Sequence, residues 1–364
     1  MKLKTTSKYI FLLTTTILIF LVSHCYSQES KTEKFYWKNF RGVNASTNLT
    51  EKDIIDLHSW NVNLLRISMA TLPIIQMEKP YNINDGAFEY LDSIINWCEK
   101  YNISVVIDPH RYPGMANQWT MLGNDSIWID FKFHNLIEKV WHEISYRYKD
   151  KGKVIAGYDI LNEPEISPSF NEGTPADINL FYNKIAATIR RNDTVHSIIL
   201  ALPRFYLDGE MRDYHEGIEY IKLPVDDNIV LESHSYMPVK FTHQNVWNDE
   251  KIVHYPDLIN GEYWNLKYLK VVQSKLIDFS RKNPKIPIFI GEFSCPIWTG
   301  DDGIRYLKDI IKISEKNNWS WAYHSFRESP VWDAEKSGFN KSNLTSTENN
   351  SRLRLLKKYF KKNR

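Results

Sequence analysis

The chain has 364 residues, of which 43% are hydrophobic and 25% charged, and 46 Lys and Arg against 44 Asp and Glu give a net charge of +2. These fractions are typical of a folded globular protein and exclude a disordered chain or a fibre. The near-neutral charge argues against a nucleic-acid-binding protein. The length suits one large domain, such as a barrel, or two medium ones.

The first 27 residues have the pattern of a secretory signal peptide. Three lysines precede a run of 14 mostly apolar residues, 9–22, and small polar residues follow. The run is shorter than the about 20 residues that a membrane span needs. We therefore expect export to the periplasm, the cell surface or the medium, with Gln28 as the first mature residue. Lipid attachment at Cys25 is the alternative, although His24 fits a lipoprotein signal poorly.

Strand-like and helix-like segments alternate along the rest of the chain. Eight short apolar runs lie at 40–44, 64–69, 104–110, 154–164, 197–205, 228–236, 286–295 and 319–326. They are nearly continuous, as expected of parallel strands covered on both faces. Amphipathic stretches lie between them, at 86–100, 129–149, 176–191, 265–281 and 303–317. The alternation predicts an α/β fold, a (β/α)8 TIM barrel, with 28–364 as a single domain.

Cofactor patterns are missing from the sequence. After the signal peptide only Cys98 and Cys295 remain, both in apolar surroundings, so we expect buried thiols and no disulfide framework. Neither HExxH, CxxC nor HxH occurs. We therefore expect no metal and no other cofactor. Near the end of the chain, Leu353, Leu356 and Phe360 have helical spacing and predict a final amphipathic helix.

Polar side chains close most of the apolar runs. In a TIM barrel the active site lies at the carboxyl ends of the strands, and the residues found there are Arg66, His110, Asn162, Glu163, His234, Tyr236, Glu292 and His324. Glu163 and Glu292 end the fourth and seventh runs. A half-buried carboxylate costs free energy. A single one is more often a structural ion pair, whereas two at one barrel mouth favour catalysis.

Paired carboxylates are what glycoside hydrolysis requires. One protonates the leaving oxygen, and the other attacks the anomeric carbon or activates water. Arg66 is placed to keep one carboxylate ionised, because a nearby cation lowers a carboxylate pKa, and Tyr236 is placed to donate a hydrogen bond to it. His110, His234 and Asn162 are candidates for binding sugar hydroxyls.

These motifs resemble glycoside hydrolase family five, the cellulase family, over about 36–330. The matching segments are RGVN at the first strand, Arg66, DPH with His110, ILNEP with Asn162 and Glu163, HSY with His234 and Tyr236, and IGEF with Glu292. The resemblance implies that Glu163 is the acid/base and Glu292 the nucleophile. It also implies a covalent glycosyl-enzyme and retention of anomeric configuration, for which the two carboxyl groups lie about 5–5.5 Å apart.

One position departs from the family pattern. The family usually has a Trp near the end of strand eight, where this chain has His324, and we expect Trp321 to lie in the core. The departure leaves the substrate preference open. For Arg327 and Glu328, which follow in the sequence, we expect a local ion pair.

Aromatic residues in the loops are candidates for sugar platforms, since sugar C–H faces are apolar. Trp119 and Trp298 lie nearest the catalytic strand ends and are favoured, with Tyr112, Trp247 and Trp332 as further candidates. A general acid must hold its proton near the working pH, so we expect a raised pKa for Glu163 and an ionised Glu292.

The leading hypothesis is an exported, monomeric, retaining β-glycanase that cuts β-1,4-linked glucan in a polysaccharide or oligosaccharide. A second hypothesis keeps the chemistry and changes the substrate to mannan or another hemicellulose, or the action to exo-cleavage. A third is a carbohydrate-binding surface protein that has lost catalysis. A metal-dependent barrel hydrolase is a fourth, disfavoured because metal-ligand motifs are missing.

Overall fold

The computed structural model describes residues 34–37, 39–115, 126–166, 172–207, 210–247, 251–347 and 349–363. The chain divides into two units, Met1–Lys34 and Phe35–Arg364, and the account below concerns the second. The predicted signal peptide lies outside the described residues. Within the described ranges, no helix has both the length and the hydrophobicity that crossing a bilayer requires.

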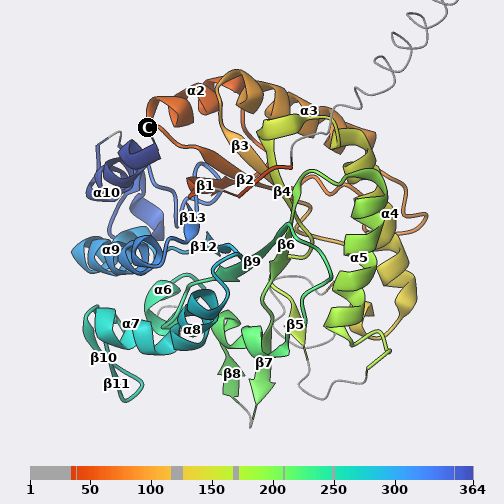
Figure 1. The fold of residues 1–364 in the computed structure, drawn as a ribbon. Coiled ribbons are helices and arrows are strands. Elements are labelled where there is room, and N and C mark those ends of the chain that lie inside the picture. Colours follow the sequence, from red (N-terminus) through yellow and green to blue (C-terminus); the bar gives the residue numbers. More distant parts are fainter. Residues whose placement is uncertain are drawn as a thin grey trace, which may run out of the picture. The chain divides into compact units, whose positions relative to one another are not determined.

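Eight parallel strands form a closed barrel (Figure 1). In chain order they are β1 (Arg41–Ala45), β2 (Leu64–Ser68), β3 (Ser104–Asp108), β4 (Ile155–Asp159), β6 (Ser197–Ala201), β9 (Ile229–His234), β12 (Ile288–Glu292) and β13 (Ser320–Tyr323). Seven of the strands lie inside the predicted runs, and β1 extends one residue past its run. The barrel closes where Arg41 of β1 pairs with Trp321 of β13. The predicted TIM barrel is therefore confirmed.

Helices surround the barrel (Figure 1). They are α2 (Glu51–Ser59), α3 (Asp85–Lys100), α4 (Phe131–Tyr148), α5 (Ile178–Asn192), α7 (Leu266–Val272), α8 (Ser274–Lys282), α9 (Gly300–Lys316) and α10 (Ser351–Phe360). The helix predicted over 265–281 is in fact two, which meet at Gln273. The side chain of Gln273 is buried and donates to Ser235 Oγ at 3.1 Å.

Two long connections add small structures to the barrel. After β6 the chain forms the hairpin β7 (Arg204–Leu207) and β8 (Glu210–Arg212), and a 3-10 helix over Tyr214–Tyr220 takes the place of an α-helix. A short strand after β4, β5 (Glu165–Ile166), pairs with β7. After β9 come α6 (Val239–Thr242) and the hairpin β10 (Asp257–Ile259) and β11 (Glu262–Trp264). A last hairpin, β14 (Lys336–Ser337) and β15 (Thr345–Ser346), follows β13.

The interior of the barrel has an apolar layer and a polar layer. Leu64, Val106 and Val230 belong to an apolar cluster with Phe289. Residues two positions apart in a strand share a face, so Arg66, Asp108 and Glu232 follow these residues toward the carboxyl ends of their strands. All three polar side chains are fully buried. The polar layer therefore forms the floor on which the site is built.

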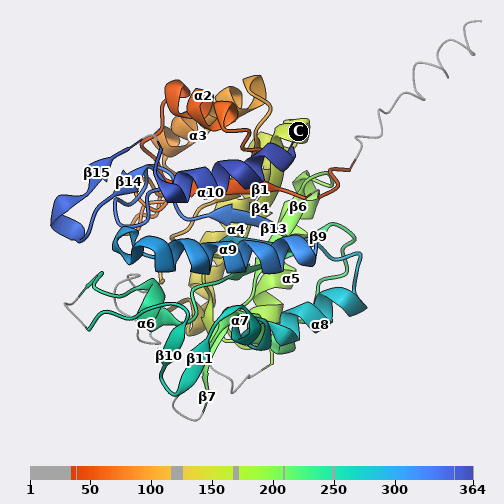
Figure 2. The same ribbon diagram turned by 90° about the vertical axis from the view of Figure 1, so that its left-hand side faces the viewer.

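The last helix, α10, lies between α2 and α9 (Figure 2). Leu353, Leu356 and Phe360 are buried, as the helical spacing predicted. Arg352 is buried as well and donates to the backbone oxygen of Cys295 at 2.6 Å. Beyond the helix, Asn363 Nδ2 donates to the backbone oxygen of Arg41 at 3.1 Å. These bonds fasten the C-terminal segment to the first and seventh barrel strands.

Candidate active site

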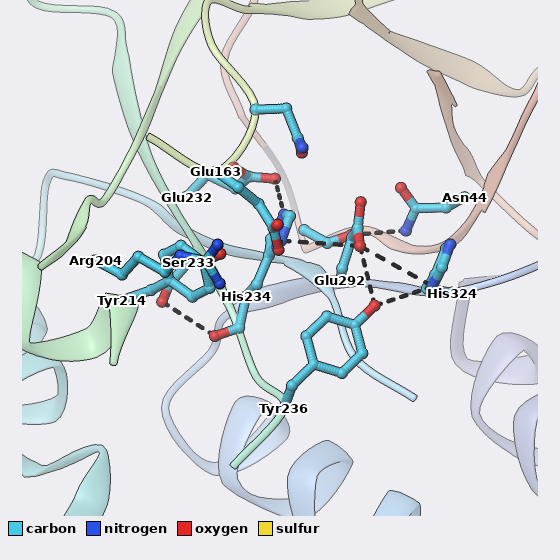
Figure 3. Close-up of polar contacts among 12 residues, drawn as sticks. Asn44, Glu163, Arg204, Tyr214, Glu232, Ser233, His234, Tyr236, Glu292 and His324 are labelled. Atoms are coloured by element: carbon cyan, nitrogen blue, oxygen red, sulfur yellow. Dashed lines mark hydrogen bonds and ion pairs between the residues drawn. The ribbon is translucent and has the colours of Figure 1, made fainter. Parts of the chain in front are cut away.

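The two glutamates of the NEP and GEF motifs meet at the carboxyl ends of β4 and β12 (Figure 3). Glu292 is the last residue of β12 and Glu163 lies four residues after β4, in the left-handed backbone region at φ 46°. One oxygen of each carboxylate and one ring nitrogen of His234 all lie within 4.8 Å of one another. The predicted pair of carboxylates is thus brought together in space.

Glu292 is held by donors on two sides. Arg66 Nη1 donates to its Oε1 at 2.9 Å, and Tyr236 Oη donates to its Oε2 at 2.9 Å. Burial alone raises the pKa of Glu292, but His234, His324 and Arg66 together outweigh it and lower the pKa to about 2. Glu292 is therefore ionised at neutral pH, as a nucleophile must be.

The carboxylate of Glu163 is hydrogen-bonded to the side chain of His234. His234 Nδ1 donates to Glu163 Oε1 at 2.8 Å, and His234 Nε2 faces Glu232 Oε1 at 3.1 Å. Both ring nitrogens of His234 thus face carboxylates, so both carry protons. Burial lowers the pKa of His234, but Glu292, Glu232 and Glu163 raise it well above its usual value.

The expected raised pKa of Glu163 in the free protein is therefore wrong. Burial raises it, but the bond from His234 and the charges of His234 and Arg204 hold it below its ordinary value. The proton that a general acid needs is present in the site, but it lies on His234 at 2.8 Å from the Glu163 carboxylate.

Arg66 is the centre of the polar layer. Its guanidinium is fully buried and lies within 3.3 Å of four carboxylates, those of Asp108, Asp159, Glu232 and Glu292. It also donates to Asn44 Oδ1 at 3.2 Å and to Asn162 Oδ1 at 2.9 Å. The contact with Glu292 was predicted. Those with Asn44, Asp108, Asp159 and Glu232 were not, because each is a polar residue within one of the apolar runs from which the strands were predicted.

Position 291 in β12 has to be a glycine because the side chain of Glu232, from the neighbouring strand β9, lies against its backbone. A Cβ added to Gly291 would lie 1.7 Å from Glu232 Oε1. The backbone oxygen of Gly291 accepts a bond from Asn44 Nδ2 at 2.7 Å. The missing side chain at Gly291 thus lets the Glu232 carboxylate reach both Arg66 and His234 beside the strand that carries Glu292.

The remaining predicted polar residues line the same mouth. His110 Nδ1 lies 2.6 Å from Asp108 Oδ2, and its Nε2 lies 3.4 Å from Asn162 Nδ2. His324 Nδ1 lies 2.9 Å from Tyr236 Oη (Figure 3). All eight polar residues selected from the strand ends therefore belong to one connected set.

The segment around His324 differs from the prediction at one point. Trp321 is fully buried, as expected. Arg327, however, does not pair with its neighbour: it binds Asp53 and Asp56 of α2 and, at 2.6 Å, Glu335. The expected Arg327–Glu328 ion pair is therefore wrong. Glu328 faces His324 instead, with 3.5 Å between Oε2 and Nε2.

The loop aromatics that the sequence suggested as sugar platforms have different surroundings. Tyr112 is fully buried and donates to the backbone oxygen of Ile160 at 3.0 Å, so it belongs to the core. Trp298 is half-buried and donates to the backbone oxygen of Gln244 at 3.0 Å. Trp332 packs against His324 with ring centroids 5.3 Å apart. Trp119 lies outside the described residues.

Exposed Trp247 stacks on His243, with centroids 5.2 Å apart and an interplanar angle of 13°. His243 in turn contacts Tyr236 and Trp332. An aromatic row therefore extends outward from Tyr236 on the side of the loops that follow β9 and β13.

Within the described part of the chain, the group of side chains that could hold a metal ion is the same one that shares the acidic proton. Glu163, His234 and Glu292 are close enough to share a cation. Both nitrogens of His234 are already directed at carboxylates, however, and a protonated ring nitrogen offers no lone pair to a metal. The group is better suited to sharing a proton than to holding a metal ion.

Two acidic side chains that face each other at the carboxyl end of a parallel barrel are the arrangement that a glycoside hydrolase needs. Residues 28–329 match the family described as Cellulase (glycosyl hydrolase family 5). The chain therefore belongs to glycosyl hydrolase family 5 and is a glycoside hydrolase, as its motifs predicted.

Curated relatives are distant in sequence. The chain is 23% identical over 318 residues to Cellodextrinase A of Ruminococcus flavefaciens, covering 84% of this chain and 85% of that protein. It is 25% identical over 336 residues to Endoglucanase C of Acetivibrio thermocellus, with coverage of 82% and 88%. The match to Endoglucanase 3 of Fibrobacter succinogenes is 30% over 173 residues, which is 47% of this chain and 24% of that protein.

Solved structures share the fold at low identity. Thermotoga maritima Cel5A in complex with cellobiose superimposes with a TM-score of 0.66 at 22% identity, covering 88% of this chain and 96% of that one. The same protein in complex with mannotriose gives a TM-score of 0.65 at 22% identity, with coverage of 88% and 97%.

Proposed function

We propose that this protein is a retaining β-glycanase that hydrolyses β-1,4-linked glucan, with Glu292 as nucleophile and Glu163 as acid/base. The observation that carries the proposal is the approach of the two carboxylates, whose nearest oxygens lie within 4.8 Å. This approach is closer to the separation of about 5–5.5 Å between the carboxyl groups of retaining enzymes than to the about 6.5–9.5 Å of inverting ones. The relatives named endoglucanase and cellodextrinase support glucan as the substrate.

The two steps follow from the positions of the side chains. Glu292 attacks the anomeric carbon while Glu163 gives a proton to the glycosidic oxygen, and the glycosidic bond breaks. Water then attacks the same carbon from the side of Glu163, which takes its proton, and Glu292 leaves. Because Glu163 is ionised in the free protein, it needs a proton first. The Glu163 side chain is 30% exposed. A bound sugar removes the remaining water, and this favours transfer of the His234 proton across 2.8 Å.

The experiment that tests this function is release of reducing sugar by chain 28–364, with EDTA present. The panel is carboxymethylcellulose, mixed-linkage β-glucan, glucomannan, galactomannan and xylan, with the Glu292→Ala variant as the blank. We expect release from the glucans that is lost in the variant. Activity on galactomannan or xylan alone would replace the substrate, and no release from any of the five polymers would direct the test to short oligosaccharides. Sugar binding without turnover would indicate a protein that has lost catalysis.

Mannan is the second candidate because of His324. This residue stands where the family usually has a Trp, so the stacking surface at the cleaved sugar differs. The Thermotoga maritima protein has been solved with both cellobiose and mannotriose, which shows that one protein of this fold accommodates both sugars. Export through residues 1–27 also belongs to the proposal and is supported by the signal-like sequence alone.

The Glu163→Gln variant should lose the basic limb of the pH–rate profile. The proton shared by Glu163 and His234 is required in the first step, so the wild-type rate falls as pH rises through the pKa of the pair. With glucan, whose leaving oxygen needs protonation, we expect a rate loss of about 10²- to 10⁴-fold. With a dinitrophenyl β-cellobioside the first step should be much less affected. An unchanged basic limb in the variant would reject Glu163 as the acid.

A further inference from the structure

His324 is linked to the nucleophile on one side and to Glu328 on the other. Its Nδ1 lies 2.9 Å from Tyr236 Oη and 4.0 Å from Glu292 Oε2. Its Nε2 lies 3.5 Å from Glu328 Oε2. Figure 3 shows Tyr236 between Glu292 and His324. A line of polar groups thus runs from Glu328 through His324 and Tyr236 to Glu292.

The hydrogen bonds along this line indicate the protonation state of the His324 imidazole. Tyr236 has one hydroxyl proton and donates it to Glu292. The hydrogen between Tyr236 Oη and His324 Nδ1 must therefore come from His324. The other nitrogen, Nε2, faces a carboxylate, which is an acceptor only. With this carboxylate as acceptor, both ring nitrogens carry protons and His324 is a cation.

We propose that Glu328 is a positioning residue that holds His324 as a cation, so that His324, through Tyr236, stabilises the carboxylate of Glu292 when it leaves the sugar. The inference rests on the proposed function, since it concerns the second step of the same reaction. In that step the bond between the anomeric carbon and Glu292 breaks, and its electron pair returns to the carboxylate. The attacking water gives its proton to Glu163.

Glu328 forms an ion pair with His324 and does not pair with Arg327. Arg327, the cation next to it in the chain, is bound to Asp53, Asp56 and Glu335. Glu328 Oε2 is buried and has no hydrogen-bond partner among the described residues, which leaves the ion pair with His324 as its contact. Trp332 packs on the imidazole, with centroids 5.3 Å apart, and limits the access of water.

The groups that face His324 favour its charged form on balance. Burial lowers the pKa of His324, and His234 lowers it too, but Glu292 and Glu328 raise it above its usual value. His243, on the other side of Tyr236 and Trp332, is held neutral at pH 7 because burial lowers its pKa to about 4. The cation beside the nucleophile therefore depends on the two carboxylates.

The Glu328→Gln variant should slow the second step without slowing the first. A Gln of the same shape removes the anion that supports the imidazolium. With a dinitrophenyl β-cellobioside, whose first step is fast, the covalent intermediate then accumulates. We expect kcat and KM to fall together, while kcat/KM stays within about twofold. At a pH above the pKa of His324 in both proteins, a one-unit fall in that pKa reduces the cation, and with it kcat and KM, by about tenfold.

Glu335→Gln is the matched control. Glu335 and Glu328 line the same cavity of about 650 Å³. The Glu335→Gln substitution removes one negative charge, as Glu328→Gln does, but the partner of Glu335 is Arg327 and not His324. We expect its kcat and KM to remain at wild-type values, and thermal unfolding of both variants checks the fold. Equal effects in the two variants would mean that cavity charge, rather than contact with His324, matters. Unchanged kinetics in Glu328→Gln, or a fall in kcat/KM alone, would overturn the proposal.

Two measurements keep the proposal testable if Glu328→Gln is unstable or if no glycoside is cleaved. Titration of the His324 ring protons by NMR in chain 28–364 should give a pKa above 6.5 in wild type and a lower one in Glu328→Gln, but not in Glu335→Gln. In a His324→Gln background, the Glu328→Gln change should have no further effect on kcat. A wild-type protein that cleaves no panel substrate rejects the proposed function, whereas an unmoved His324 titration rejects the role of Glu328.

Discussion

The Glu292→Ala variant should lose turnover by more than about 10⁴-fold, because the covalent step has no substitute for the attacking carboxylate. The variant should still fold. Arg66 would still face Asp108, Asp159 and Glu232, so the change removes one of four anions crowded around a single buried cation. Because the pKa of Glu292 is lowered in the folded protein, its ionised carboxylate stabilises the fold at neutral pH. We therefore expect a variant that still folds but has a lower unfolding free energy than the wild type at pH 7, measured by denaturant titration beside the kinetics.

Chemical rescue separates the two glutamates. In Glu292→Ala, azide can enter the space of the lost carboxylate, attack the anomeric carbon of a dinitrophenyl β-cellobioside and give the α-glycosyl azide. In Glu163→Ala, the nucleophile is intact, so azide reacts with the covalent intermediate and gives the β-glycosyl azide. Identical product anomers from both variants, or near-wild-type turnover by Glu292→Ala, would rule out the assigned roles.

The Arg66→Met variant should lose about 3–5 kcal/mol of stability, which is the usual cost of leaving a buried charge without its partner. Here four carboxylates lie within 3.3 Å of the guanidinium. Activity should fall as well, since Glu292 loses the donor at 2.9 Å. Arg41→Met is the control, because Arg41 is partly exposed and pairs with one carboxylate, that of Glu315. We expect a loss of about 1 kcal/mol there.

The defect of Arg66→Met should depend on pH in a definite direction. Without the cation, the folded protein loses the group that stabilises the ionised carboxylates around it, whereas the unfolded chain still ionises its carboxylates at about pH 3.9–4.3. The extra cost of folding is then absent below about pH 4 and grows as pH rises above it. Denaturant unfolding at pH 4 and pH 7 should show a larger difference from wild type at pH 7. A difference that is independent of pH would show that lost packing, not charge, causes the defect.

The barrel and the meeting of Glu163 and Glu292 at its mouth were predictable from the sequence because they rest on local patterns. A strand buried on both faces is an apolar run, and a barrel puts the residue at the end of each run at one mouth. The polar layer was not predictable, since Asp108, Asp159 and Glu232 are single carboxylates within strands. Only the structure shows that they share Arg66.

The location of the proton and the ion pairs around His324 depend on distances that a sequence does not contain. Glu163 was expected to hold the proton, but His234 lies 2.8 Å away between two carboxylates and keeps it. Arg327 and Glu328 are neighbours in the chain, yet their side chains have different partners. Arg327 reaches the acidic residues of α2, which are about 270 residues away in the sequence.

The closure of the barrel has a consequence for when the protein can fold. Phe40, just before β1, bonds to Ser320 across 280 residues, and Asn363 bonds to Arg41 across 322. Phe40 can bond to Ser320 only after the eighth strand has left the ribosome, and Asn363 can bond to Arg41 only after α10 has followed. Closing so distant a pair is slow because the loop entropy is lost before the contacts form. The barrel therefore stays open until β13 has been made, and the segment after α10 then adds a second link to the first strand.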